Sequence, residues 1–269
     1  MNKFIITCGT SQLDCSALEK LSPRARSQFK TRGLEREFKT PSTEIPQGFT
    51  TWVNEEIVPA CQIIRENGLE ALGDKIGTKE NPLGAELTTL HLLKYRKVST
   101  QWNPQNDYLV LLSSETGKGK SAAKMIKIMV EHIYEVNPDN IEIDEVQKLT
   151  EKPQNIDRTL NNFASQILNH IDLETPFYQH YSLLMSGGFK SVIPCMTLAS
   201  FLFGIELVYV FEASNQLQSL HPKIDLSTEK ERKIWQKTWD QLAEKGLQNQ
   251  PSYAYTLVRS RQENPQRSY

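Results

Sequence analysis

The chain has 269 residues, of which 38% are hydrophobic and 23% are charged. This composition supplies a substantial core and excludes an intrinsically disordered chain, and the length favours one large domain. The 31 basic and 32 acidic side chains leave a net charge of −1, which argues against a protein that binds duplex DNA over a basic surface. A small anionic ligand in one locally positive pocket is compatible with this balance.

The expected strands and helices of the first half alternate along the chain. A short apolar strand at 3–7 ends in Gly9-Thr10-Ser11. Segment 16–50 is rich in basic residues and contains few large apolar ones, so we expect an exposed insertion there, part helix and part loop. Amphipathic spacing predicts a helix from 52 to about 72, and we expect a second helix that begins after Asn81-Pro82 and runs through 85–93.

The second half continues this alternation. The clearest buried strand is at 107–113, and it is followed by a helix with its apolar face between 122 and 133. The remaining predicted elements are a strand at 141–146, a helix at 156–171, a strand at 178–185, a helix at 190–203 and a strand at 206–211. Apolar strands alternating with helices predict an α/β fold, a mainly parallel Rossmann-like sheet with helices on both faces. We place this domain at 1–225 and a C-terminal helical extension, with a helix at 228–246 and a tail, at 226–269.

Neither a metal nor a cofactor is expected from the residue pattern. The cysteines form no CxxC pair, and with the five histidines they make no cluster at zinc-ligand spacing: Cys8, Cys15, Cys61 and Cys195. No signal-peptide core follows Lys3, and the apolar stretch 192–211 is interrupted by proline, glycine and glutamate. These features predict a cytoplasmic protein with no membrane partner.

Glycine and hydroxyl residues follow three of the predicted strands, at 9–11, 113–117 and 186–190. The carboxyl ends of parallel strands lie at one edge of a sheet, so these loops predict a cleft of backbone amides and helix N-termini that suits phosphate. The alternative is that glycine and serine here only end strands and cap helices. A P-loop is disfavoured because Ser114 stands where the motif of Gly117–Ser121 needs its first glycine. A serine-hydrolase elbow is unsupported because residue 13 is leucine.

Five short patches resemble the CRISPR-associated CARF proteins, in register from residue 3 to about 213. They are Ile5–Ser11, Pro82–Leu87, Leu109–Thr116, Met185–Lys190 and Leu207–Glu212, and the Gly-Gly-Phe-Lys of the fourth is the most specific. Compact members of this family include ring nucleases. The resemblance implies a homodimer whose shared pocket binds cyclic oligoadenylate, usually the tetramer, which type III CRISPR complexes make on sensing foreign RNA.

The resemblance also implies roles for the three loops. Ser11 and Lys190 would be catalytic in a metal-independent cleavage that leaves linear products ending in 2′,3′-cyclic phosphate. The implied ligand-binding residues are Gly9, Thr10, Gln12, Ser113, Ser114, Glu115, Thr116, Gly187, Gly188 and Phe189. The chain departs from the family pattern at Gln12, where a small or apolar residue is common. It also departs in the insertion at 22–50, which is either a lid over the ligand or a surface elaboration.

Two functions remain open at this point. The first is a ring nuclease that switches off the signal, and the second is a non-catalytic sensor that binds the ring and regulates a partner or effector. About 55 residues follow position 213, which is short for most effector domains and favours the enzyme. A Rossmann-type enzyme acting on another nucleotide is disfavoured because no Gly-x-Gly-x-x-Gly follows the first strand.

Overall fold

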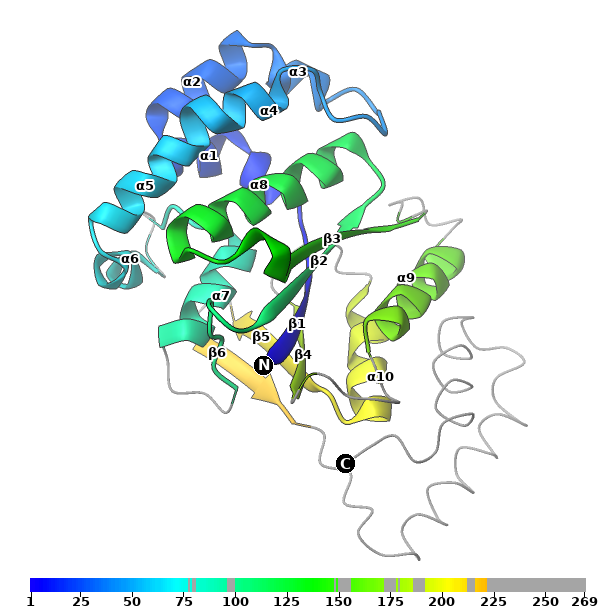
Figure 1. Cartoon of the computed structure of the whole chain (residues 1–269). Coiled ribbons are helices and arrows are strands. Elements are labelled where there is room, and N and C mark those ends of the chain that lie inside the picture. The colour runs from blue at the N-terminus through cyan, green and yellow to red at the C-terminus, as the bar shows by residue number, and fades with distance from the viewer. Residues whose placement is uncertain are drawn as a thin grey trace, which may run out of the picture.

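The computed structural model describes residues 1–76, 78, 81–95, 100–147, 149, 156–171, 178, 180–185, 192–211 and 216–221. Its strands are β1 (Asn2–Thr7), β2 (Tyr108–Ser114), β3 (Ile141–Val146), β4 (His180–Met185), β5 (Glu206–Phe211) and β6 (Gln216–Leu220). They form one sheet in the order β3-β2-β1-β4-β5-β6, with the first five parallel and β6 antiparallel to β5 (Figure 1). The predicted α/β fold with a mainly parallel sheet is confirmed.

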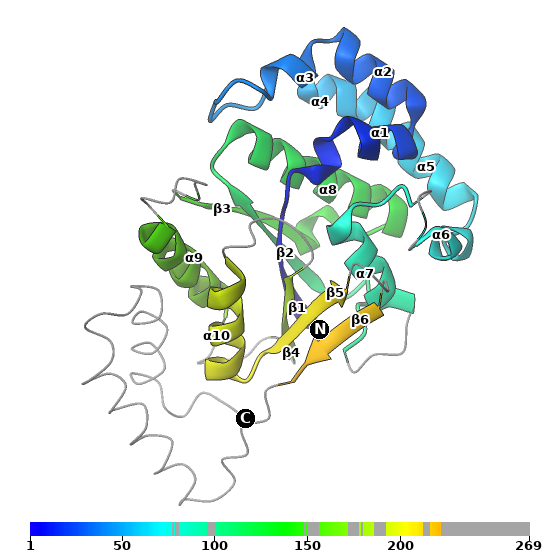
Figure 2. The same ribbon diagram turned by 180° about the vertical axis from the view of Figure 1, so that it is seen from behind.

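Each face of the sheet is covered by helices, as Figures 1 and 2 show from opposite sides. Successive residues of a strand point to opposite faces, so an unbroken apolar strand needs a hydrophobic layer on both. Phe4 and Ile6 of β1 join one core, and Ile5 joins the other. The first core includes α5 (Val58–Glu66), α7 (Ala85–Tyr95) and α8 (Gly117–Tyr134), and the second includes α9 (Ile156–His170) and α10 (Ile193–Phe203).

Segment 16–50 is part helix and part loop, as predicted, and most of its residues are exposed, but it is not only a surface insertion, because some of its apolar side chains are buried in the core. The helices there are α1 (Cys15–Leu21), α2 (Pro23–Thr31) and α3 (Leu34–Glu37). Leu18, Leu34 and Phe49 are completely buried, and the ring of Phe29 lies 5.0 Å from that of Trp52 between centroids. The few apolar residues of this segment therefore all contribute to the core, while the many charged ones occupy the outer surface.

The single helix predicted at 52–72 is divided. α4 (Phe49–Trp52) passes through a π-helical turn, η2 (Val53–Ile57), into α5, and a further helix, α6 (Leu69–Lys75), follows. Gly68 separates α5 from α6 with a φ of 88°, which glycine adopts more readily than other residues. Short 3₁₀ turns occur at η1 (Ser11–Leu13) and η3 (Pro138–Asn140).

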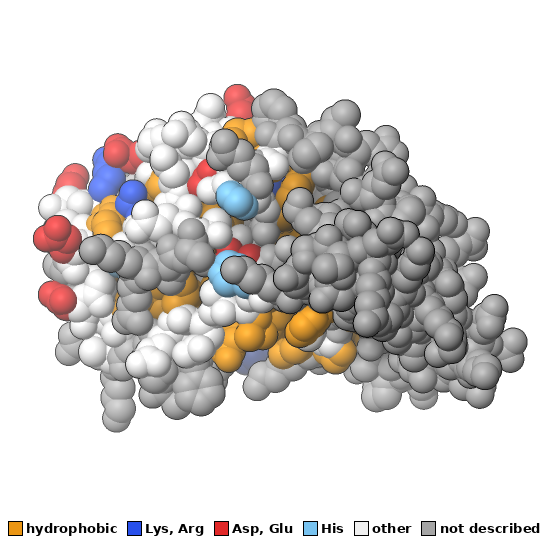
Figure 3. Space-filling model, turned by 90° about the horizontal axis from the view of Figure 1, so that it is seen from below, with side chains coloured by type: hydrophobic (Ala, Val, Ile, Leu, Met, Phe, Trp, Pro, Cys, Tyr) orange, Lys and Arg blue, Asp and Glu red, His pale blue; other side chains and the backbone are white. Residues whose placement is uncertain are grey.

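β6 is absent from the predicted elements because it is an edge strand whose residues are only alternately half-buried. The predicted helix at 228–246 and the extension at 226–269 lie outside the described residues. Among the residues described, no helix is long and apolar enough to cross a membrane. Figure 3 views the side opposite α1–α4, where the described surface mixes hydrophobic side chains with polar and acidic ones.

Candidate functional site

Two of the predicted loops, and the strand that precedes the third, meet at one edge of the sheet. β1 lies between β2 and β4, with Thr7 paired to Leu112 on one side and Ile6 paired to Leu184 on the other. The chain moves outward from β1 to β3 and then returns to place β4 on the opposite side of β1. Ligands of open α/β sheets bind at the carboxyl ends of the strands beside such a reversal.

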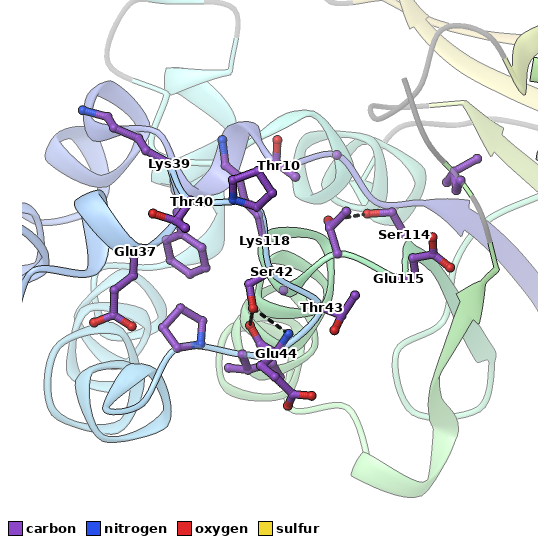
Figure 4. Close-up of a pocket in the computed structure, with 18 of the residues that line it drawn as sticks. Thr10, Glu37, Lys39, Thr40, Ser42, Thr43, Glu44, Ser114, Glu115 and Lys118 are labelled. Carbon is purple, nitrogen blue, oxygen red and sulfur yellow. Dashed lines mark hydrogen bonds between the residues drawn. The ribbon is translucent and has the colours of Figure 1, made fainter. Parts of the chain in front are cut away.

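A cavity of about 1720 Å³ opens at this edge. Gly9–Ser11 after β1 and Ser114–Lys118 after β2 line one side, and residues 38–47, which we call the strap, line the other (Figure 4). The strap connects α3 to α4 and belongs to the segment that we expected to be an exposed insertion. The cavity exceeds the roughly 300–1,000 Å³ of a site for one small molecule, so it has room for a larger ligand.

The loop after β1 rests on a buried carboxylate. The Gly9 N–H donates to Oε1 of Glu86 at 2.6 Å, and Glu86, in the first turn of α7, is completely buried. Burial raises the pKa of the Glu86 carboxyl, and the bond from the Gly9 amide partly opposes that rise. Thr10 is half-buried and Ser11 exposed, and both line the cavity. Gln12 is instead buried against Gly84.

The loop after β2 is joined to the strap. The Gly117 N–H donates to the backbone oxygen of Ser42 at 2.7 Å, and Thr116 Oγ1 accepts from the Gly119 N–H at 3.0 Å as the N-cap of α8. These contacts occupy two amides of the helix N-terminus that would otherwise bind an anion. The Ser114 and Thr116 hydroxyls lie 2.8 Å apart.

The remaining candidate residues divide into three groups. Glu115 and Thr116 line the cavity, whereas Ser113 is completely buried and its hydroxyl makes no hydrogen bond within the described part of the chain. The four candidates of the third loop lie outside the described residues: Gly187, Gly188, Phe189 and Lys190. β4, which ends at Met185 directly before that loop in sequence, is adjacent to β1. The part played by these four residues stays a prediction.

Acidic side chains outnumber basic ones in the described lining of the cavity. It contains two lysines, Lys39 and Lys118, and four carboxylates: Asp14, Glu37, Glu44 and Glu115. Lys118 Nζ lies 3.5 Å from Asp14 Oδ1, and Lys39 Nζ lies 3.1 Å from a carboxylate oxygen of Glu35. The described lining therefore carries more negative than positive charge, which by itself disfavours a polyanion.

The cations of segment 16–50 are also largely paired with carboxylates. Ion pairs join Arg24 to Glu56 at 3.0 Å, Arg26 to Glu19, and Arg32 to Glu55. The pairs of Arg26 and Arg32 are exposed or half-buried and contribute little to stability, whereas Glu56 in the Arg24 pair is buried. All three pairs offset part of the positive charge of this segment. Among the described residues, no three His, Cys, Asp or Glu side chains are grouped so that they could hold a metal ion.

The sequence analysis did not single out two features of this site, Glu86 and the strap. Glu86 is the one acidic residue of α7 and is followed directly by the buried Leu87, which was the available signal. The strap gave no comparable signal, because its contact with α8 joins segments about 75 residues apart through backbone atoms.

Comparison with known proteins gives one match. A family model described as CRISPR-associated protein (Cas_APE2256) matches residues 81–224, and no curated protein matches the chain. The matched region begins just before α7 and includes Glu86, the loop after β2 and every strand of the sheet except β1. Since this region is more than half of the 269 residues, the chain belongs to the Cas_APE2256 family of CRISPR-associated proteins.

Proposed function

We propose that this CRISPR-associated protein is a ring nuclease. In this proposal two copies of the chain bind cyclic tetra-adenylate between them and cleave it without a metal ion, which switches off the antiviral signal. Membership of a CRISPR-associated family supports a role in that defence. The resemblance to CARF proteins supports the ligand, the homodimer and the cleavage.

The observation that carries the proposal is the adjacency of β2, β1 and β4. Loops predicted independently from three separate stretches of sequence follow three neighbouring strands at the reversal point of the sheet. A large cavity opens beside the two of these loops that are described. A two-fold dimer presents each loop twice, which suits a ring with four phosphates.

The proposed reaction is an internal transfer at phosphorus. The ribose 2′-oxygen forms a bond to phosphorus while the bond from phosphorus to the 5′-oxygen breaks, and the proton lost by the 2′-hydroxyl ends on that 5′-oxygen. The products are a 5′-hydroxyl and a 2′,3′-cyclic phosphate, so no water, metal or second reactant is consumed. Ser11 is exposed at the cavity and would align the 2′-hydroxyl or the phosphate, and Lys190 would stabilise the charge that develops on the phosphate oxygens.

Because the described lining of the cavity is acidic, binding of the ring would require positively charged residues outside that lining. The four phosphates would lie next to four lining carboxylates from each copy of the chain, and like charges repel one another unless positive groups intervene. The proposal therefore assigns Lys190, in both copies of the dimer, as the principal counter-charge. Lys190→Ala is expected to slow cleavage roughly 10²–10³-fold, the effect of removing one preorganised donor to a developing oxyanion.

The test is chromatography of cyclic tetra-adenylate incubated with the protein in EDTA. We expect linear products ending in 2′,3′-cyclic phosphate, a roughly 10²-fold slower reaction for Ser11→Ala with binding retained, and light scattering at twice the 30.8 kDa chain mass. Ser16→Ala and Lys20→Ala, exposed changes on α1 outside the cavity lining, are the matched controls. Binding without cleavage would favour the sensor hypothesis. Loss of activity in EDTA, or a monomer in the presence of ligand, would contradict the proposed mechanism.

A further inference from the structure

Glu86 is a buried acidic residue that accepts a hydrogen bond from the loop after β1. Its side chain has no solvent exposure, Oε1 accepts the Gly9 N–H at 2.6 Å, and Oε2 makes no hydrogen bond to any of the described residues. Burying a carboxylate is costly unless bonds compensate it. Outside its own helix, the hydrogen-bond donor that this carboxyl group meets among the described residues is the Gly9 amide, and the backbone N–H of Glu86 itself also stabilises the charged form.

The same loop has a second attachment at its other end. Gln12 is 1% exposed, and its side-chain amide packs so closely on Gly84 that any Cβ at residue 84 would overlap it. Gly84 directly precedes α7 and Glu86 lies in its first turn. The start of α7 therefore contacts the loop at two points, Gly9 and Gln12. Between these attachments, Thr10 and Ser11 line the cavity.

We propose that Glu86 is a positioning residue that fixes the Gly9–Ser11 loop, so that the Ser11 hydroxyl meets the bound phosphate in a reactive alignment. This inference rests on the proposed function. It extends that function by assigning a task to a residue that touches no ligand. Misplacing a reacting group by about 1 Å can cost roughly 10²-fold in rate while binding is largely retained, so Glu86 is expected to affect turnover more than affinity.

The experiment compares Glu86→Leu, which removes the acceptor, with Glu86→Gln, which keeps an acceptor oxygen for the Gly9 N–H. Thr89→Val is the matched control, because Thr89 is a buried polar residue of α7 whose hydroxyl bonds only the helix backbone, at Ala85, in the described structure. Two readouts are measured: cleavage of cyclic tetra-adenylate, with kcat separated from KM, and hydrogen exchange of the Gly9 amide without ligand.

For Glu86→Leu we expect Gly9 exchange to accelerate roughly 10-fold or more, and kcat to fall roughly 10²-fold with KM changed less than about 3-fold. Glu86→Gln should restore most of both, and Thr89→Val should lower thermal stability without changing either. If Glu86→Leu does not fold, Glu86→Asp, whose shorter side chain withdraws the carboxylate from Gly9, is expected to give the same losses.

The outcomes separate this inference from the proposed function. Unchanged Gly9 exchange in Glu86→Leu or Glu86→Asp, or a Glu86→Gln variant as impaired as Glu86→Leu, overturns the positioning role. An unchanged kcat despite faster Gly9 exchange overturns it as well. If the wild-type protein does not cleave the ring, the proposed function fails. In that case the loss of Gly9 protection still decides whether Glu86 holds the loop.

Discussion

The contact between the strap and α8 makes Gly117→Ala an informative substitution. A Cβ at residue 117 would overlap the backbone oxygen of Glu44, and because backbone cannot rotate aside like a flexible side chain, the strap must shift. The shift breaks the 2.7 Å bond from the Gly117 N–H to Ser42, a loss of about 0.5–1.5 kcal/mol. The higher helix propensity of alanine offsets part of this loss. Glycine destabilises a helix interior by about 1 kcal/mol relative to alanine, and the effect is smaller at the first helical residue.

The net change in unfolding free energy is therefore expected to stay below about 1 kcal/mol, a shift in Tm of at most roughly 2–4 °C for a protein of this size. Local opening of the strap should change much more. Hydrogen exchange at residues 40–45, and proteolysis there, should both accelerate several-fold, whereas Lys118→Ala, at the next helix position, should leave both unchanged. Strap exchange identical to wild type in Gly117→Ala would show that this contact does not hold the strap.

Three further substitutions test buried polar groups. Gln12→Met removes a buried amide nitrogen that has no hydrogen-bond partner among the described residues, so urea denaturation should show unchanged or higher stability; a loss above about 2 kcal/mol would reveal a partner. Asp107→Ala should cost about 2–4 kcal/mol in the same assay, because that carboxylate accepts the Asn2 and Asn103 N–H groups, each at 2.7 Å. His91 is buried, which lowers its pKa from 6.5 to about 4. Between pH 6.5 and 4 the unfolded chain takes up a proton that the folded protein does not, so stability should fall on acidification, by on the order of 1 kcal/mol at pH 5, and His91→Phe should flatten that dependence.

The local periodicity of the sequence predicted most of the described fold. The strand expected at 107–113 is β2 at Tyr108–Ser114, and the helix expected at 156–171 is α9 at Ile156–His170, because both patterns are unbroken and strongly apolar. What the prediction missed at 16–50 has a physical cause. Averaging composition over the segment hid a few apolar residues, including Leu18 and Leu34, that short helices bring to one side.

The candidate site was predictable only where its signals are local. Glycine and hydroxyl residues directly after a strand mark a strand end, so the loops at 9–11 and 114–117 could be found. The contacts that hold these loops are not local, since Gly9 bonds a residue 77 positions away. Hydrophobic periodicity indicates which face of a helix is buried, but it does not identify the loop that a buried carboxylate will meet.

These two long-range contacts differ in strength, and the difference has a functional consequence. Gly9 is held by the buried carboxyl group of Glu86, through a hydrogen bond in a region of low dielectric constant. Gly117 is joined by one backbone bond to a strap whose residues 40–44 are all exposed, the kind of segment that opens at low free energy. One side of the cavity, the Gly9–Ser11 loop, is therefore firmly held. The other side, the strap, can move when a ligand binds. Under the proposed function, changes at Glu86 should accordingly alter the rate of cleavage, whereas changes at Gly117 should alter how fast the ring binds and dissociates.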